Sequence, residues 1–183
     1  MKFTIFETKF GYSGIVYLLE DNSATVKHVF LPRSKKAVKT AIIDKFAEAL
    51  SSPGHEVSEL RSRIQNFFLG KPDPIPQSLV DLTICAPFQL SVLMEEYAIP
   101  RGMTSSYGRI AKLLNSKAVR AVGNALARNP FPIVIPCHRA IRSDRTLGGF
   151  QGGLEMKRRI LNLEGVKFDS DGRVHIDCFL DTP

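Results

Sequence analysis

Residues 104–139, TSSYGRIAKLLNSKAVRAVGNALARNPFPIVIPCHR, contain the clearest structural signals in the chain. The polar run 104–106 offers good N-caps for a helix that ends before a two-residue turn at 115–116. A second helix is expected over 117–128, because the Asn-Pro pair that follows cannot continue it. Two short helices joined by so tight a turn predict a helix-turn-helix, although helical hairpins without that role are common.

The second of these helices has a composition that suits contact with a duplex. Lys117, Arg120 and Arg128 can meet phosphates, while small Ala121 and Gly123 between them let the helix backbone approach closely. Around it, residues 101–159 hold 12 basic and only 2 acidic residues, in a chain of net charge +7. A solvated basic face is the alternative, but an Arg-rich block on a helix-turn-helix favours nucleic-acid binding.

The first part of the chain predicts strands followed by helices. Apolar, β-branched runs at Phe3–Phe6, Gly14–Leu19 and Ala24–Leu31 indicate a small antiparallel meander. Two amphipathic helices should follow. The expected apolar faces are Ile42, Ile43, Phe46 and Leu50 for the first, and Val57, Leu60, Ile64 and Phe67 for the second.

Three prolines between Gly70 and Pro76 mark the best linker in the chain. Beyond it, helices are expected over 86–97, with Leu90, Leu93 and Tyr97 inward, and over about 154–164, with Met156, Ile160 and Leu163 inward. We also expect a short β-like run at 131–135 and a hairpin over 166–176. The fold class is therefore α+β: a small sheet-plus-helices domain over 1–80, then a mostly helical domain with the helix-turn-helix over 81–183.

Cys137 and His138 form the one pair that suggests covalent chemistry. A thiol must become a thiolate to attack, and a neighbouring imidazole can take its proton. Adjacent side chains on a strand point to opposite faces, so the pair can cooperate only if the chain turns at Cys137. A buried, inert cysteine is the common alternative. The double glycines at 148–149 and 152–153 add a loop whose backbone N–H groups can face a ligand, or an ordinary surface turn.

Several classes of protein are disfavoured. No apolar run approaches the ~18 residues of a membrane span, and no secretion signal is visible. Three widely spaced cysteines, at 85, 137 and 178, do not make a disulfide framework, so a reducing cytoplasm is expected. No Cys or His spacing fits zinc, no nucleotide-binding fingerprint occurs, and we expect neither metal nor cofactor.

Residues 104–166 resemble the catalytic domain of the O6-alkylguanine-DNA alkyltransferases. The resemblance lies in the Pro-Cys-His-Arg tetrad at 136–139, the Asn-Pro-x-Pro-Ile run before it, and the Tyr-Gly and Arg-Ala-Val-Gly segments of the helix pair. It covers about a third of the chain strongly; the preceding residues match only in size and element order. It implies irreversible, single-turnover transfer of an alkyl group from O6 of guanine in duplex DNA to the protein's own cysteine.

The resemblance also implies roles for individual residues. Cys137 would accept the alkyl group, His138 would take its proton through a water molecule, and Glu164 would orient His138. Asn129 would support the turn at the cysteine, and Tyr107 would donate its hydroxyl to the guanine ring. The substrate pocket would comprise Pro132, Ala140, Phe150, Gln151 and Gly152.

Because the target carbon lies inside a stacked duplex, the base must be flipped out. The resemblance places Arg120 in the resulting gap, with its helix in the minor groove and with Lys117, Ala121, Gly123 and Arg128 against the DNA. A monomer is expected.

Two departures from the family accompany this resemblance. Phe150 stands where many members have tyrosine, so a hydroxyl contact is lost there. The first domain lacks the Cys-Cys-His-His set that holds structural zinc in some relatives. Two other functions stay open at this point: a non-catalytic helix-turn-helix DNA binder or damage sensor, and a cysteine hydrolase. One related group has tryptophan at the cysteine position and only senses damage, and Cys137 argues against that group.

Overall fold

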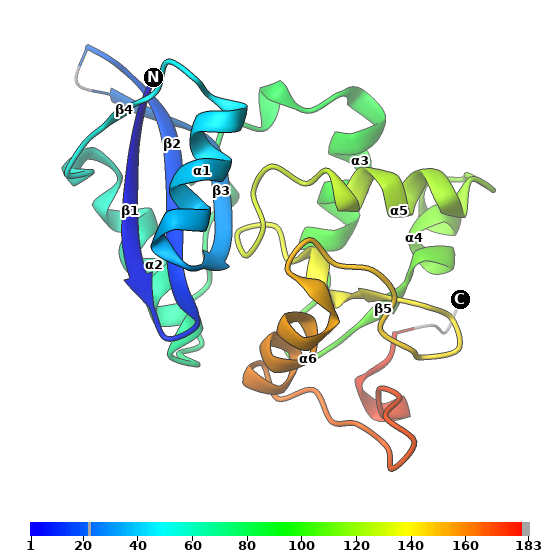
Figure 1. The fold of residues 1–183 in the computed structure, drawn as a ribbon. Coiled ribbons are helices and arrows are strands. Elements are labelled where there is room, and N and C mark those ends of the chain that lie inside the picture. The colour runs from blue at the N-terminus through cyan, green and yellow to red at the C-terminus, as the bar shows by residue number, and fades with distance from the viewer. Residues whose placement is uncertain (22, 181–183) are drawn as a thin grey trace. The chain divides into compact units, whose positions relative to one another are not determined.

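The N-terminal strands form one four-stranded sheet in a computed structural model that describes residues 1–21 and 23–180 (Figure 1). The strands are β1 (Lys2–Thr8), β2 (Gly11–Glu20), β3 (Ser23–Arg33) and the short β4 (Leu50–Ser51). Their order is β3-β2-β1-β4, antiparallel except for the parallel β1–β4 pair. The predicted meander is confirmed, with strands longer than the apolar runs alone indicated.

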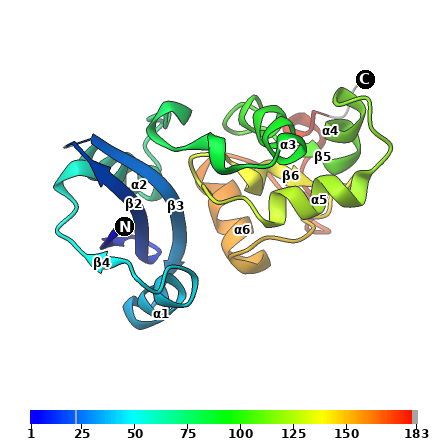
Figure 2. The ribbon, with the colours of Figure 1, turned by 90° about the horizontal axis from the view of Figure 1, so that it is seen from above.

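Two helices cover opposite faces of this sheet (Figure 2). Both faces of the sheet carry apolar side chains, because successive side chains along a strand point to opposite sides. Helix α1 (Lys35–Lys45) packs on the face that carries Phe3 and Val16. Helix α2 (Ser58–Phe68) follows the 3-10 turn η1 (His55–Val57) and buries the whole face predicted for it, Val57, Leu60, Ile64 and Phe67.

The apolar face predicted for the first helix is partly right: Ile42 is buried and Phe46 packs against the same core, but Ile43 and Leu50 are exposed. Ser34 caps α1 by accepting the Ala37 N–H at 3.2 Å, so the helix starts early and its buried residues are Val38 and Ile42. Helix α1 ends at Lys45, and Leu50 lies in β4, where pairing with β1 leaves it 72% exposed. Ile43 is also exposed. Helical spacing in the sequence therefore continued past the residue at which the helix stops.

The residues divide into two compact units: 1–84 with 130–134, and 85–129 with the residues from 135 onward. The proline-rich segment belongs to the first unit and contains the 3-10 turns η2 (Gln77–Leu79) and η3 (Leu82–Ile84). Asp81 ties it to β3, since its N–H donates to the Val26 carbonyl and its carboxylate pairs with Lys27 at 2.5 Å. The domain limits 1–80 and 81–183 stay a prediction, and residues 181–183 lie outside the described residues.

The second unit is mostly helical. Its helices are α3 (Pro87–Tyr97), α4 (Tyr107–Leu113), α5 (Val119–Ala127) and α6 (Gly153–Leu163). Two short strands, β5 (Ser105–Ser106) and β6 (Ala140–Ile141), pair in parallel. The small sheets and helices confirm the α+β fold class.

The predicted pair of short helices is also confirmed. Ser106 caps α4 by accepting the Arg109 N–H at 2.9 Å, and α4 packs against α5. Asn115 takes a left-handed backbone conformation, φ +52°, in the turn between them, which asparagine tolerates well. The second helix begins at Val119, two residues later than predicted.

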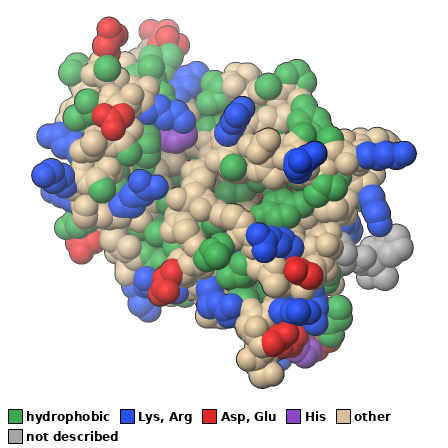
Figure 3. Space-filling view, turned by 45° about the vertical axis from the view of Figure 1, so that its right-hand side comes forward, with side chains coloured by type: hydrophobic (Ala, Val, Ile, Leu, Met, Phe, Trp, Pro, Cys, Tyr) green, Lys and Arg blue, Asp and Glu red, His purple; other side chains and the backbone are tan. Residues whose placement is uncertain are grey.

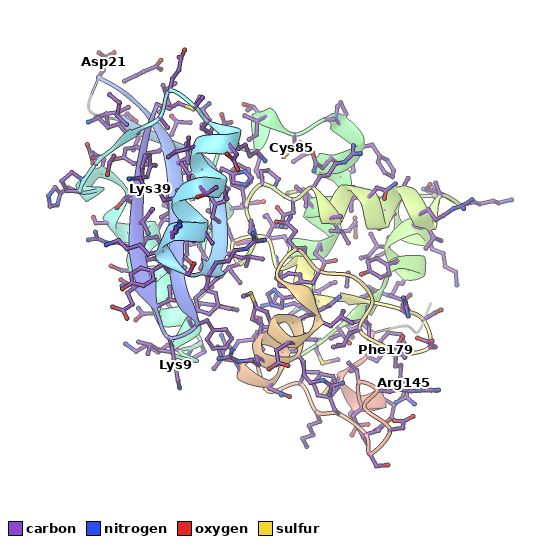
Figure 4. All side chains as sticks on the ribbon, in the orientation of Figure 1. Lys9, Asp21, Lys39, Cys85, Arg145 and Phe179 are labelled. Atoms are coloured by element: carbon purple, nitrogen blue, oxygen red, sulfur yellow. The ribbon has the colours of Figure 1, made fainter. Side chains whose placement is uncertain are left out.

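A hairpin-like segment closes the unit, as expected for residues 166–176. Phe168 and Val174 form an antiparallel bridge. Arg145, labelled in Figure 4, joins it to the loop after β6 by donating to Asp169 and to the Val174 carbonyl, each at 2.8 Å. The core beneath contains Ile141, Leu147, Leu161, Val166, Val174 and Cys178, with Phe168 and Phe179 packed against it.

Two local predictions for residues 131–163 fail in whole or in part. Residues 131–135 form a turn rather than a β-like strand, with Ile133 at φ +75°, a strained region for a β-branched residue. Ile160 on α6 is buried as predicted, but its buried neighbours are Lys157 and Leu161 rather than Met156 and Leu163, which are half-buried. No helix among the residues that the structure describes is both long and apolar enough to cross a membrane.

Candidate active site

Cys137 opens a 3-10 turn, η4 (Cys137–Arg139), directly after Pro136. The turn is fixed from two sides, because the Cys137 N–H donates to the Ile135 carbonyl at 2.8 Å and the buried Asn129 amide donates to the same carbonyl at 2.9 Å. The Asn129 side chain also hydrogen-bonds the Cys137 thiol. The chain therefore turns at the cysteine, which is the condition that the Cys137–His138 pair needs in order to act together.

Behind the cysteine lies a buried chain of polar side chains. His138 Nε2 is 3.2 Å from Glu164 Oε1, and both side chains are fully buried. Arg139 donates two hydrogen bonds to the same carboxylate, Nη2–Oε1 at 2.6 Å and Nε–Oε2 at 3.0 Å. A bidentate arginine fixes both the charge and the orientation of a carboxylate. The structure thus brings together four predicted residues, Asn129, Cys137, His138 and Glu164, and adds Arg139.

The charge states follow from burial and these partners. Burial alone would raise the pKa of Glu164, but His138 and Arg139 outweigh it and hold the pKa at about 2, so this group is a carboxylate. Burial lowers the pKa of His138, against the pull of Glu164, and leaves a neutral imidazole at pH 7. Burial raises the pKa of Cys137 to about 12 despite the Asn129 hydrogen bond. The resting site is therefore a thiol beside a neutral base, and attack requires proton removal.

The thiol opens onto a cavity of about 550 Å³, a size typical of small-ligand sites. One wall is α5 and the other is the glycine loop 148–151. Its lining residues are Tyr107, Val119, Arg120, Gly123, Asn124, Leu126, Ala127, Cys137, Arg142, Gly148, Gly149, Phe150 and Gln151. Six of these were predicted as site residues from the sequence: Tyr107, Arg120, Gly123, Cys137, Phe150 and Gln151.

Tyr107 stands at the start of α4 and closes one side of the cavity. Burial raises its pKa to about 12, so the hydroxyl keeps its proton and can donate it in a hydrogen bond. The hydroxyl lies 3.4 Å from the Gly149 carbonyl. Gly148 passes so close that a Cβ there would lie 2.9 Å from the Tyr107 ring, and its φ of +64° also favours glycine. The first of the double glycines therefore lets the loop approach Tyr107.

The remaining predicted pocket residues are not among those that line the cavity. Ala140 is buried in β6, Gly152 caps α6, and Pro132 belongs to the segment that groups with the first unit. Gln151 does reach inward: its amide donates to the Asn129 carbonyl at 2.9 Å and ties the loop to the cysteine turn.

The predicted DNA-contacting residues share one element. Lys117, Arg120 and Arg128 are exposed on or beside α5, and a Cβ added at Gly123 would meet open space. The small residue at 123 is therefore not required for packing within the described chain. Ala121 is half-buried on the same helix. Figure 3 shows Lys and Arg side chains spread over the face that it draws.

Sequence reasoning missed three charged residues of this site. Arg142 lines the cavity. Lys157 is fully buried and its ammonium donates to the carbonyls of Ala140 at 2.6 Å, Leu147 at 2.5 Å and Gly149 at 3.1 Å. Glu96, near the end of α3, is also fully buried. Helical spacing could have indicated two of them. Lys157 shares a helical face with Ile160, Leu161 and Glu164, and Glu96 shares one with Val92 and Leu93.

Within the described part of the chain, no cluster of three or more His, Cys, Asp and Glu residues could hold a metal ion. The chemistry that these residues themselves support is activation of one thiol toward a ligand that enters the cavity.

Comparison with known proteins gives consistent results. Residues 87–166 match the family described as "6-O-methylguanine DNA methyltransferase, DNA binding domain". A methylated-DNA–protein-cysteine methyltransferase of Methanothermobacter thermautotrophicus is 42% identical over 119 residues, which are 65% of this chain and 67% of the relative. A protein of the same name from Saccharolobus islandicus is 38% identical over 120 residues, 66% of this chain and 77% of the relative.

The fold has a counterpart among solved structures. The crystal structure of Mycobacterium tuberculosis OGT in complex with DNA matches with a TM-score of 0.72 at 28% identity. The match covers 90% of this chain and 92% of that chain, so the likeness includes the N-terminal sheet as well as the helical part.

Proposed function

The chain belongs to the family of methylated-DNA–protein-cysteine methyltransferases, and we propose that Cys137 carries out the reaction of that family. The protein binds DNA and repairs it by moving a methyl or other alkyl group from O6 of guanine to its own cysteine. The observation that carries this proposal is the Cys137 thiol at a 550 Å³ cavity between α5 and the glycine loop, backed by His138 and Glu164. A non-catalytic damage sensor would not need that arrangement.

The transfer needs only the side chains of the site, one water molecule and the alkylated base. The Cys137 proton passes through a water molecule to His138; because Nε2 already faces Glu164, Nδ1 receives it. Sulfur then attacks the alkyl carbon, the S–C bond forms, the C–O6 bond breaks, and the electron pair leaves on guanine. Tyr107 donates its hydroxyl to the departing base, which lowers the charge that the base must carry. The thioether is not reversed, so each molecule reacts once.

Four residues around the thiol have separate roles in the transfer. Glu164 stabilises the imidazolium that forms at His138 and is itself held by Arg139. Asn129 fixes the turn that aims the sulfur, and its contact with the thiol favours the thiolate. These roles of Asn129, Cys137, His138, Glu164 and Tyr107 are part of the proposal.

The alkylated base must be flipped out of the duplex to enter the cavity, because the alkyl carbon on O6 is inaccessible while the base is stacked. The exposed Arg120 on α5 lines the cavity, a position that suits a side chain filling the gap left by the flipped base. Lys117 and Arg128 would meet phosphates, and Ala121 and Gly123 would allow close approach. Phe150 and Gln151 would bound the base inside the cavity, with Ala140 and Gly152 supporting its walls.

Stoichiometry tests the proposed function. Duplex DNA with a radiolabelled O6-methylguanine, given in excess, should transfer one methyl group per protein molecule and then stop. Continued turnover, or no label on the protein while DNA is bound, would refute suicide transfer.

We also propose a monomer in a reducing cytoplasm, since one chain supplies every group of the site and its three cysteines are free. Sedimentation of the complex with a short duplex gives the oligomeric state.

Transfer is expected to need neither metal nor cofactor, since the thiol and the alkylated base contain all the reacting atoms. Treatment with EDTA should leave the rate within about twofold of the untreated protein, because no Lewis acid takes part in the proposed step. Loss of activity that zinc restores would contradict this expectation.

Binding to undamaged duplexes should depend strongly on salt. Log K is expected to fall linearly with log salt at a slope of roughly −3 to −5, since each neutralised phosphate contributes about −0.9 and we expect about three to six contacts. Removing Lys117 or Arg128 should weaken binding to all sequences alike and flatten the slope by about one unit. Titrations at several salt concentrations measure both values. A salt-independent affinity, or strong preference for one undamaged sequence, would argue for a transcription factor instead.

A further inference from the structure

Glu96 is a buried carboxyl group for which the proposed reaction has no role. Its residue is 0% exposed, near the C-terminal end of α3 on the face that packs against η4. Neither carboxylate oxygen has a well-formed hydrogen bond within the described residues, although the Ala140 amide is near enough to favour the charged form. A buried carboxylate is costly without partners, so this group must respond to the charges around it.

Those charges belong to the candidate active site. Arg139 and Cys137 act from η4, Lys157 and Glu164 from α6 and its C-cap, and Tyr107 from α4. The charged side chains of α5, which also packs on α3, are Arg120 and Arg128, and both are exposed. Since Arg139 already neutralises Glu164, the charge balance behind the thiol depends on Glu96 and Lys157.

Lys157 retains its positive charge for a geometric reason. Its three carbonyl acceptors, Ala140, Leu147 and Gly149, match the three N–H groups of an ammonium, whereas an amine could serve only two. Burial lowers its pKa to about 8, and Arg142 adds to the effect, but the full set of acceptors favours the charged form at neutral pH. No carboxylate of the described chain lies within ion-pair distance of it.

The two groups influence the Cys137 thiol in opposite directions. A negative charge on Glu96 disfavours the thiolate, whereas the positive charge on Lys157 favours it. With Glu96 neutral, the ammonium stands uncompensated beside the reacting sulfur. With Glu96 ionised, the two charges cancel.

We propose that Glu96 is a positioning residue for alkyl transfer, which decides by holding or releasing one proton whether Lys157 can stabilise the Cys137 thiolate. The inference rests on the proposed function for its biological meaning, but the coupling between Glu96 and Cys137 is a property of the chain alone. It assigns to Glu96 an effect on the nucleophile without contact to the substrate.

The expected dependence on pH follows from burial. Desolvation raises the pKa of Glu96 to about 8, against the pull of Lys157 and Arg139. Below about pH 7 Glu96 is neutral and does not oppose the Cys137 thiolate. Above about pH 9 Glu96 is charged and opposes the thiolate, and Lys157, whose pKa is about 8, no longer offsets that charge. Removing the Glu96 carboxylate should therefore change the reactivity of Cys137 only above the pKa of Glu96.

The test compares Glu96→Gln with the wild type in the rate at which iodoacetamide alkylates Cys137, followed by peptide mass at pH 6.5 and at pH 9.0. The variant-to-wild-type ratio is expected to lie within about twofold of one at pH 6.5, and to reach about fivefold at pH 9.0. Glu95→Gln, the half-buried neighbour on α3, is the matched control and should give a ratio near one at both values. O6-benzylguanine in place of iodoacetamide should give the same pattern.

A ratio that is equal at both pH values would overturn the proposal, because a merely structural effect does not follow the charge of Glu96. Glu96→Leu, which removes the charge with an apolar side chain of similar size, should behave as Glu96→Gln and serves if the amide variant does not fold. The wild-type profile should bend downward near pH 8 more strongly than the Glu96→Gln profile, and profiles of the same shape in the two proteins also contradict the proposal. If iodoacetamide shows the pattern and O6-benzylguanine does not react, the coupling stands and the proposed function fails.

Discussion

Cys137→Ser is expected to abolish alkyl transfer while leaving DNA binding within about twofold of the wild type. Serine matches cysteine closely in shape, so the turn held by Asn129 and the cavity should persist. Its hydroxyl is a far weaker nucleophile at neutral pH and is activated less readily by one imidazole. We expect the single-turnover rate with O6-methylguanine duplex to fall at least about a thousandfold.

The other two cysteines provide the controls. Cys85 and Cys178 are buried, and Cys178 belongs to the core of the second unit, away from the cavity lining. Cys85→Ala and Cys178→Ala should keep transfer within about threefold, apart from any loss of stability from the removed sulfur. A Cys137→Ser protein that still gains a methyl group would remove Cys137 as the acceptor.

Arg120→Ala is expected to separate two substrates, of which only the duplex requires base flipping. With duplex DNA, loss of the side chain that fills the gap should raise the cost of the extrahelical base, and the rate should fall about ten- to a hundredfold. With free O6-benzylguanine the rate should change by less than about twofold, since a free base needs no flipping. Single-turnover rates at saturating DNA and at saturating free base measure both.

Arg128→Ala is the matched control on the same helix. Arg128 is exposed at the C-cap of α5 but does not line the cavity, so its loss should weaken duplex binding without changing the rate at saturation. Equal losses on duplex and free base in Arg120→Ala would instead indicate that Arg120 maintains the cavity wall.

Local signals made the helical part readable from the sequence. Ser106 caps α4 as its type predicts, and the Asn-Pro pair after α5 ends that helix. The Cys137–His138 pair needed a turn, and Pro136 and Asn129 supply it. The run 131–135 misled because β-branched residues favour strands, whereas the structure gives Ile133 a positive φ that no propensity could indicate.

The inward faces of α3 and α6 could not be read from apolar residues alone. Both helices bury an ionisable side chain, Glu96 on α3 and Lys157 on α6. A search for apolar residues at helical spacing leaves these two positions out and therefore misplaces part of the buried face of each helix. Lys157 is accommodated by carbonyls 8 to 17 residues earlier in the chain, which come together only in the folded protein. Buried charges of this kind depend on tertiary contacts, so their positions are visible in the sequence but their partners are not.

Transfer to Cys137 is tested most simply by peptide mass spectrometry of the wild-type protein after reaction with a duplex that contains one O6-methylguanine. We expect one added methyl group per molecule, about 14 Da, located on the peptide that contains Cys137 and resistant to thiol reductants, as expected of a thioether. Addition at Cys85, Cys178 or another residue, or an unchanged protein mass while the duplex is bound, would contradict it.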